Sequence, residues 1–177
     1  MSELTETAEG VSLDAPTADT DLTFERFFEA ERARLFQALA VITRSRSEAE
    51  DISQEAFLRV WERWERVRDL QDPAGYLHRT AMNAFRDRYR RARLSLTRAL
   101  RPLPGSDELD AVEARSVVDQ ALGKLAPRQR AALVLTEGLG YSAEEAGAFL
   151  GIKGSTVRAL HHQARAALSK GSEATDE

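Results

Sequence analysis

The stretch "YSAEEAGAFLGIKGSTVRALHHQARAAL", residues 141–168, has the pattern of two helices separated by a tight turn. Ser142 and Glu145 form a capping-box pattern, in which the two side chains satisfy free backbone N–H groups where a helix begins. Gly151 follows the apolar residues of that helix, and glycine most readily adopts the left-handed conformation that ends a helix. The stretch therefore predicts a helix-turn-helix, a unit that commonly places its second helix in the major groove of DNA.

The second helix of this unit has an apolar side and a polar side. At about 100° per residue, Val157, Leu160, Ala164 and Leu168 fall together on the apolar side. Hydrogen-bond donors for phosphates and base edges occupy the polar side and the helix start: Ser155, Thr156, Arg158, His162 and Arg165. The two capped helices and the position of Gly151 favour DNA binding over the alternative, a helical hairpin whose charges are only solvated.

The neighbouring His161 and His162 raise the question of a metal site. Adjacent residues of a helix point about 100° apart, and no carboxylate or cysteine lies at ligand spacing. The chain has no cysteine at all, which excludes disulfides, thiolate metal sites and cysteine nucleophiles. The sequence also offers no phosphate-binding loop and no nucleophile–base pair. We therefore expect no metal, no cofactor, no small-molecule substrate and no enzymatic activity.

Residues 24–93 show the same helical periodicity. The segment "FERFFEAERARLFQALAVI", residues 24–42, repeats apolar residues every three or four positions, which predicts one buried stripe. Ser47 and Glu50 form a capping-box pattern that predicts the start of a second helix, and Pro73 predicts the start of a third. The sequence shows no strand-like alternation of any length, so the predicted fold class is all-α.

The second of these helices contains "DISQEAFLRVWERW", residues 51–64, and separates an apolar face from a mostly acidic one. The apolar positions that share a face, or lie beside it, are Ile52, Ala56, Phe57, Val60, Trp61 and Trp64. A different face carries Asp51, Gln54, Glu55, Leu58 and Glu62.

The third helix contains "RTAMNAFRDRYRRAR", residues 79–93, with six arginines. On a helical wheel, Arg79, Asn83, Arg86 and Arg90 form one stripe opposite an apolar stripe. Arginine can neutralise phosphates without reading sequence, whereas asparagine can read a base edge or hold an extruded base. The segment alone is equally consistent with a solvated basic face on a bundle helix.

Charge is segregated along the chain, whose formal net charge is −4 at pH 7. The residues before Thr23 include acids and no Lys or Arg, and an acidic segment follows Pro104 and Gly105. These segments read as a tail and a linker, and the folded segments are locally basic. The predicted organisation is two small all-α domains at residues 23–93 and 114–170, a flexible linker at 94–113, and disordered tails at 1–22 and 171–177.

The N-terminal residues have no basic segment followed by a long apolar run, which a signal peptide would need. No stretch of the chain is long and apolar enough for a membrane span. We therefore expect a cytoplasmic protein that does not act at a membrane.

Three segments together resemble the bacterial sigma factors. "AEDISQEAFLRVW", residues 49–61, resembles their core-polymerase-binding segment. "GYLHRTAMNAFRDRYRR", residues 75–91, is similar to the −10-reading helix of the extracytoplasmic-function group. "LAPRQRAALVL", residues 125–135, together with residues 141–168, resembles the −35-reading domain of that group. The resemblance covers about residues 24–168, nearly everything outside the tails.

The resemblance implies an alternative sigma factor with a region 2 helical bundle and a region 4 helix-turn-helix. The acidic face at Asp51, Gln54, Glu55, Leu58 and Glu62 would bind the β′ coiled coil of core RNA polymerase. The −10 element would be contacted by Arg66, Arg68, Asp69, Arg79, Asn83, Arg86 and Arg90, with Asn83 as reader and residues 66–69 around a flipped base. Region 4 would contact the −35 duplex of the promoter DNA and the β flap. An anti-sigma factor is a further partner that the resemblance implies.

The recognition helix departs from the pattern of the family. In "TVRALHHQAR", residues 156–165, Ala159, Leu160 and Gln163 replace a Ser and two Arg, and His161 stands at a usually apolar site. Tyr76 also stands where the family usually has Trp. The −35 preference of relatives is therefore no basis for assigning one to this chain.

Two other functions remain as alternatives. The chain could be a free-standing helix-turn-helix transcriptional regulator whose first domain dimerises or senses a signal. It could also be a helical regulator that binds polymerase without binding DNA. Promoter-specific transcription with core polymerase distinguishes both from a sigma factor.

Overall fold

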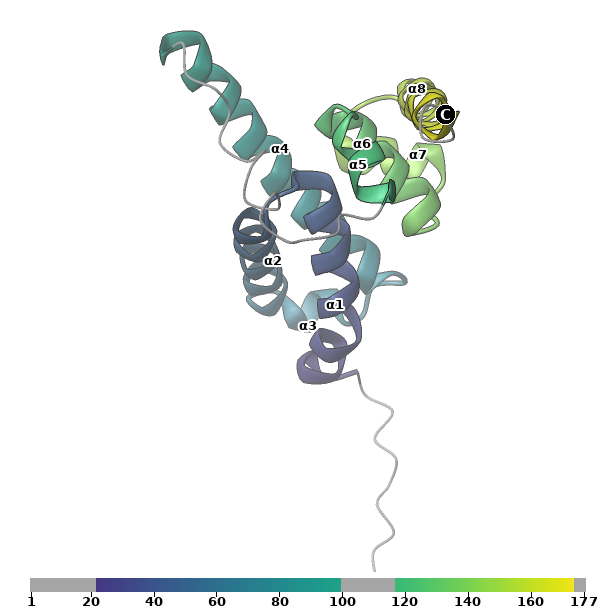
Figure 1. The fold of residues 1–177 in the computed structure, drawn as a ribbon. Helices are drawn as coiled ribbons and strands as arrows, with labels where there is room; N and C mark the ends of the chain where they lie inside the picture. The colour runs from purple at the N-terminus through teal and green to yellow at the C-terminus, as the bar shows by residue number, and fades with distance from the viewer. Residues whose placement is uncertain (1–21, 100–116, 174–177) are drawn as a thin grey trace, which may run out of the picture.

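The computed structural model describes residues 22–99 and 117–173, and within these ranges it contains helices and no strand, which confirms the all-α prediction. The first domain contains α1 (Phe24–Thr43), α2 (Arg46–Trp61), the short α3 (Trp64–Val67) and α4 (Pro73–Ala99). The second contains α5 (Val117–Gly123), α6 (Pro127–Leu133), the π-helical turn η2 (Val134–Gly138), α7 (Ala143–Leu150) and α8 (Gly154–Glu173). Figure 1 shows that the C-terminal part of α4 projects beyond the other helices.

Helix α2 begins two residues earlier than the capping pattern predicts. The cap is Ser45, whose side chain accepts a hydrogen bond from the backbone N–H of Glu48 at 3.2 Å, so the prediction of Ser47 was wrong. The turn is set by Arg44, which adopts the left-handed conformation with φ of 58°, and by Thr43, whose hydroxyl accepts a hydrogen bond from the Ser45 N–H. Pro73 begins α4 as predicted.

Two predicted boundaries fall inside helices. Helix α4 continues to Ala99, so residues 94–99 of the predicted linker are helical, and α8 continues to Glu173, three residues into the predicted tail. Residues 94–99 contain no Gly or Pro, the residues on which the linker prediction rested, and nothing in them ends the helix. The remaining linker residues 100–113 and the tails 1–21 and 174–177 lie outside the described residues.

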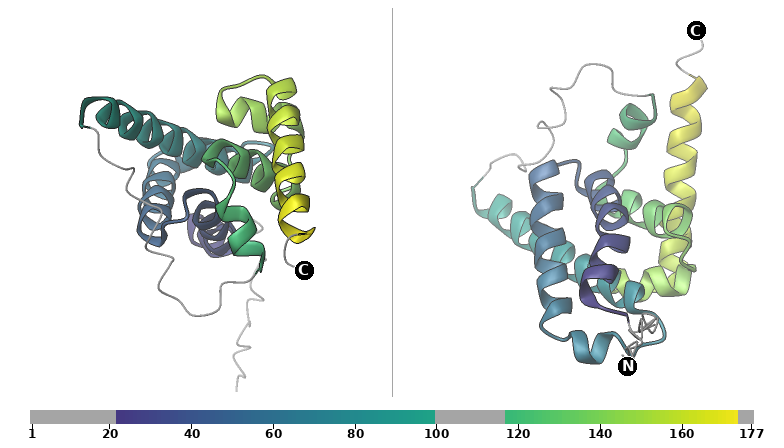
Figure 2. Two further views of the ribbon diagram at one scale, coloured as in Figure 1. Left: turned by 45° about the horizontal axis from the view of Figure 1, so that its top comes forward. Right: turned by 90° about the horizontal axis from the view of Figure 1, so that it is seen from below.

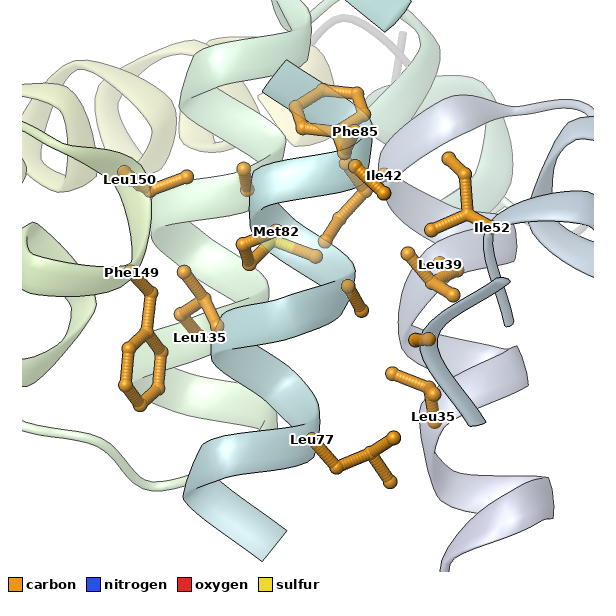
Figure 3. Packing of buried hydrophobic residues seen from close by; sticks show 14 of the residues in the cluster. Leu35, Leu39, Ile42, Ile52, Leu77, Met82, Phe85, Leu135, Phe149 and Leu150 are labelled. Atoms are coloured by element: carbon orange, nitrogen blue, oxygen red, sulfur yellow. The ribbon is translucent and has the colours of Figure 1, made fainter. Parts of the chain in front are cut away.

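The first domain buries the apolar faces of α1, α2 and α4 against one another. Leu39 and Ile42 of α1 and Ile52 of α2 have no solvent exposure, and Leu77 of α4 joins them (Figure 3). Trp64 closes one end of this core, with ring centroids 5.5 Å from Phe24 and 5.1 Å from Phe27. This packing places α4 with one side buried and the other available.

The two domains are packed together through a continuous apolar core. Figure 3 shows α4 lying between α1 and the second domain, with Met82 of α4 facing Leu135 and Leu150 nearby on α7. In both views of Figure 2, α8 lies along one edge of the molecule, with α1 and α6 between it and α2.

Hydrogen bonds join the domains as well. Arg130 of α6 is only 5% exposed and donates from Nε to the carbonyl oxygen of Ile42 at 3.0 Å and from Nη1 to that of Leu125. Burial lowers the pKa of Arg130 to about 10, so the guanidinium stays charged at neutral pH. Arg34 of α1 donates to the carbonyl oxygen of Leu139 at 3.1 Å.

Substituting Arg130 by Met should destabilise the protein, because two carbonyl oxygens lose a charged donor. Hydrogen bonds to charged groups contribute about 1.5–3 kcal/mol each, but methionine also avoids the cost of burying a charge, so the free energy of unfolding should fall by about 2 kcal/mol. The midpoint of thermal unfolding, followed by circular dichroism, should fall by about 4–8 °C. Arg128→Met is the matched control, since Arg128 is exposed on the same helix. Equal midpoints for the two variants would contradict the assigned role.

Candidate functional site

Helix α4 presents the predicted basic stripe. Arg79 and Arg90 are exposed, Asn83 and Arg86 are half-buried, and the opposite side of the helix is anchored in the core. Arg86 donates from Nη1 to Oδ1 of Asn83 at 3.3 Å, which holds the amide in the stripe. Arg90 forms an ion pair with Asp87 of the same helix, with Nη2 and Oδ1 3.3 Å apart. The stripe thus combines phosphate-binding cations with a single amide that can pair with a base edge.

The segment before α4 is held beside the start of that helix. Arg63 donates from Nη1 to the hydroxyl oxygen of Tyr76 at 3.2 Å, so the tyrosine at this position provides a polar contact. In the predicted base-holding segment, Arg66 and Asp69 are exposed and Arg68 is half-buried, with its Nε 3.8 Å from Oδ1 of Asp69. These side chains are accessible to a ligand.

The predicted acidic face of α2 is accessible but partly paired. Asp51, Gln54, Leu58 and Glu62 are exposed and Glu55 is half-buried. Arg88 of α4 spans two of the acids, with Nη1 3.2 Å from Oδ2 of Asp51 and Nη2 3.2 Å from Oε2 of Glu55. Arg59 also donates to Glu55, at 2.7 Å. Two of the five predicted protein-binding residues therefore also fasten α2 to α4.

Sequence reasoning missed Arg88 and the exposure of Trp61. In the sequence, Arg88 is one of six arginines in a run. Only the packing of α4 on α2 shows that it binds acids of α2 and is not part of the stripe. Trp61 is 59% exposed because α2 ends there and the chain turns, so that Trp64 enters the core in its place. Leu58, three residues earlier, is 54% exposed. Exposed Trp and Leu three positions apart on a helix are typical of a protein-docking surface. This spacing is visible in the sequence and could have predicted the surface.

The second domain contains the predicted helix-turn-helix. The Ser142 hydroxyl accepts from the Glu145 N–H at 3.2 Å, and the Glu145 carboxylate accepts from the Ser142 N–H at 2.8 Å. Gly151 ends α7 with φ of +65°. At Gly147, a Cβ atom would collide with the carbonyl oxygen of Ile152, so only glycine lets the turn pack this closely. These local features hold α8 at a fixed angle to α7.

Helix α8 exposes every predicted DNA-contacting residue, namely Ser155, Thr156, Arg158, His162 and Arg165. Val157 and Ala164 are fully buried on its other side.

Acids of the same domain pair with the exposed cations of α8. Arg158 Nη1 lies 2.6 Å from Oε1 of Glu144, and this hydrogen bond lowers the pKa of the Glu144 carboxyl. Glu137 accepts from His161 Nε2 at 2.8 Å and lies 3.6 Å from Arg165 Nη1. A phosphate could reach Arg158 or Arg165 only in competition with these carboxylates.

Among the residues that the structure describes, no group of three His, Asp or Glu side chains could hold a metal ion. No helix in the described part of the chain has an apolar stretch long enough to cross a bilayer.

Comparison with known proteins assigns the two domains to one family. Residues 27–94 match the family model for Sigma-70 region 2, and residues 115–168 match that for Sigma-70, region 4. The chain is 31% identical over 159 residues to the ECF RNA polymerase sigma factor SigM of Mycobacterium tuberculosis, covering 89% of this chain and 81% of that protein. This chain belongs to the extracytoplasmic-function sigma factors of the sigma-70 family.

Other relatives agree with this assignment. The sigma factor is 32% identical over 150 residues to the RNA polymerase sigma-E factor of Streptomyces coelicolor, covering 83% of this chain and 84% of that one. Its fold is similar to that of the sigma factor RpoE from Bartonella quintana, crystallised with the anti-sigma factor NepR, with a TM-score of 0.70 at 19% identity. That match covers 85% of this chain and 96% of RpoE. CnrH, in complex with the cytosolic domain of CnrY, has a TM-score of 0.56 at 29% identity, covering 85% of this chain and 88% of CnrH.

The Glu144→Gln variant of this sigma factor should bind duplex DNA more tightly, because the substitution weakens the hold on Arg158. An exposed ion pair is a weak competitor, so the affinity for a mixed-sequence 30-base-pair duplex should rise about two- to fivefold in fluorescence anisotropy. Glu29→Gln removes the same charge from an exposed ion pair on α1 and is the matched control. An equal gain in both variants would mean that only net charge matters.

Proposed function

We propose that this sigma factor binds core RNA polymerase through α2 and reads a melted promoter strand with the stripe of α4. The observation that carries the proposal is the position of Asn83, a half-buried amide between the exposed Arg79 and the half-buried Arg86, on a helix whose other side is anchored in the core. Arg79, Arg86 and Arg90 neutralise phosphates of the strand, while Asn83 hydrogen-bonds a base edge. Residues 66–69 hold a base that has left the stack.

Core polymerase binds the α2 face that carries Asp51, Gln54, Glu55, Leu58 and Glu62. The exposed Trp61 and Leu58 supply the apolar centre of this contact, and the carboxylates around them give it charge complementarity toward a basic partner. Arg88 orients Asp51 and Glu55 from behind.

The −35 duplex contacts α8 through Ser155, Thr156, Arg158, His162 and Arg165. Four positions distinguish this helix from the usual family pattern: Ala159, Leu160, His161 and Gln163. Two of the four, Leu160 and Gln163, stand where the family usually has Arg, so this helix has fewer phosphate contacts, and the −35 contact relies more on Arg158 and Arg165.

The chemistry of RNA synthesis belongs to the polymerase, and the sigma factor contributes promoter recognition and melting without catalysis of its own. It acts where core polymerase is found, in the cytoplasm. An anti-sigma protein is a further partner, by analogy with RpoE, which was crystallised with NepR.

Transcription in vitro with purified core polymerase tests the function. On genomic templates, the sigma factor should give transcripts with defined start sites that core enzyme alone does not give. If the protein yields no specific transcript but binds a duplex tightly by itself, a free-standing helix-turn-helix regulator explains it instead. If it binds core without either activity, it is a polymerase-binding regulator.

Asn83→Ala should reduce open-complex formation about 10- to 100-fold at a cognate promoter, because a base-edge contact contributes about 1–3 kcal/mol. Permanganate reactivity of the melted strand measures the open complex. Gln37→Ala removes an exposed amide from α1 and should leave opening unchanged. Loss of core binding by Asn83→Ala would refute the role as strand reader.

Trp61→Ala should weaken binding to core polymerase about tenfold or more, because an exposed tryptophan at the centre of an interface commonly dominates its free energy. Fluorescence polarisation of the labelled sigma factor with core enzyme measures the dissociation constant. Leu70→Ala is the matched control, since Leu70 is also a large apolar residue that is exposed, outside α2. An unchanged dissociation constant for Trp61→Ala would place the docking surface elsewhere.

A further inference from the structure

The packing of the two domains covers part of the α4 stripe. The guanidinium of Arg86 lies against Gly151, so closely that a Cβ atom there would collide with it. The same guanidinium donates to Oδ1 of Asn83, the acceptor that a base edge would use. Leu150, on the same turn, packs in the core that Phe85 of α4 joins. A nucleotide at Asn83 therefore needs space and hydrogen bonds that the helix-turn-helix and Arg86 now occupy.

A buried polar cluster crosses the same interface. His78 of α4 is 1% exposed, and its Nδ1 lies 2.6 Å from the hydroxyl oxygen of Tyr141, in the loop before α7. Its Nε2 lies 3.8 Å from Oε2 of Glu31 on α1, and neither of these two atoms has a hydrogen-bond partner. The Tyr141 ring also packs edge-on against Phe149 of α7, with centroids 4.8 Å apart. The cluster therefore links α1, α4 and the second domain.

Burial, more than the surrounding charges, keeps His78 neutral in this closed arrangement. Burial, followed by the positive charge of Arg34, lowers the pKa of His78 to about 4, while Asp72 acts in the opposite direction. Glu31 also faces the ring, beyond hydrogen-bond distance. Burial raises the pKa of Tyr141 to about 12, so its hydroxyl keeps its proton. At neutral pH that hydroxyl can donate to Nδ1. An imidazolium can only donate there, so protonation reverses this hydrogen bond and places a positive charge on a side chain that is 1% exposed.

We propose that the free sigma factor is closed and masks the part of its strand-reading stripe at Asn83 and Arg86, and that the Glu31–His78–Tyr141 cluster is a latch that opens when His78 binds a proton. The masking half of this inference rests on the proposed role of the stripe. The latch half concerns only the contact between the domains.

The direction of the pH effect follows from the two forms of the protein. When the domains separate, His78 meets water and its pKa returns to about 6.5, so the open form binds the proton more tightly. Closure is therefore fully stable above about pH 6.5 and is progressively lost as the pH falls toward 4. Between pH 7.5 and pH 5, the ratio of closed to open molecules should fall about 30-fold.

Energy transfer between two dyes tests the latch in the full chain. The sequence has no cysteine, so Ala30→Cys on α1 and Ala166→Cys on α8, both at exposed alanines, give two unique labelling sites. Transfer efficiency should change between pH 7.5 and pH 5 as the domains separate. His78→Asn should abolish this change, whereas His162→Asn, at an exposed histidine of α8, should retain it. A pH-independent efficiency, or the same pH profile in His78→Asn, would overturn the latch.

A second variant keeps the test decisive if the His78 substitution disturbs folding. Tyr141→Phe retains the ring and its contact with Phe149 but loses the hydroxyl, so it should be more open than the parent already at pH 7.5. Far-UV circular dichroism checks that its helices are intact. A fully closed Tyr141→Phe protein would also overturn the latch.

Binding of a mixed-sequence 12-nucleotide single strand tests the masking. The unlabelled parent should bind the strand more tightly at pH 5 than at pH 7.5, and Tyr141→Phe should bind it more tightly than the parent at pH 7.5. Opening without any gain in strand binding would overturn the masking. If Asn83→Ala leaves promoter opening intact while energy transfer still responds to pH, the proposed function fails and the latch stands.

Discussion

Helix α4 packs against α1, α2 and the second domain at the same time, and the rest of the structure depends on this packing. Its apolar side completes the core formed by α1 and α2, while Met82 and Phe85 extend that core toward the second domain. Arg88 binds the acids of α2, and the stripe leaves Arg79 and Arg90 exposed while Asn83 and Arg86 are half-buried. A change in the rotation of α4 would therefore alter the core, the proposed polymerase-binding face and the proposed strand-reading face together.

In this arrangement, access to the stripe and the packing of the second domain exclude each other in part. A strand reader must be accessible, yet the turn at Gly151 packs onto Arg86, and the Arg130–Ile42 and Arg34–Leu139 hydrogen bonds hold the second domain there. The closed form protects apolar and cationic surface in the absence of polymerase and DNA. In the proposed mechanism, a partner or the protonation of His78 separates the domains and makes the stripe accessible. The two separated domains can then contact two promoter elements.

Local signals in the sequence predicted local structure well, because each acts within a few residues. Ser142, Gly151 and Pro73 fix the backbone where they stand, and the α8 periodicity correctly separated buried Val157 from exposed Arg158. The start of α2 was misplaced because two serines compete, and the left-handed Arg44 decides between them. The role of Arg88 depends on residues 33 and 37 positions away, and the His78–Tyr141 contact spans 63 positions. Periodicity carries no information about such distant pairs.

The central claim is that Asn83 meets a base of the melted promoter strand when polymerase is bound. Replacing Asn83 with a photo-crosslinking amino acid in the holoenzyme, and mapping crosslinks in an open complex, tests it most directly. The account predicts crosslinks to a melted strand within the −10 element, and none on the closed duplex. Crosslinks to the −35 duplex, or crosslinks confined to polymerase, would contradict it.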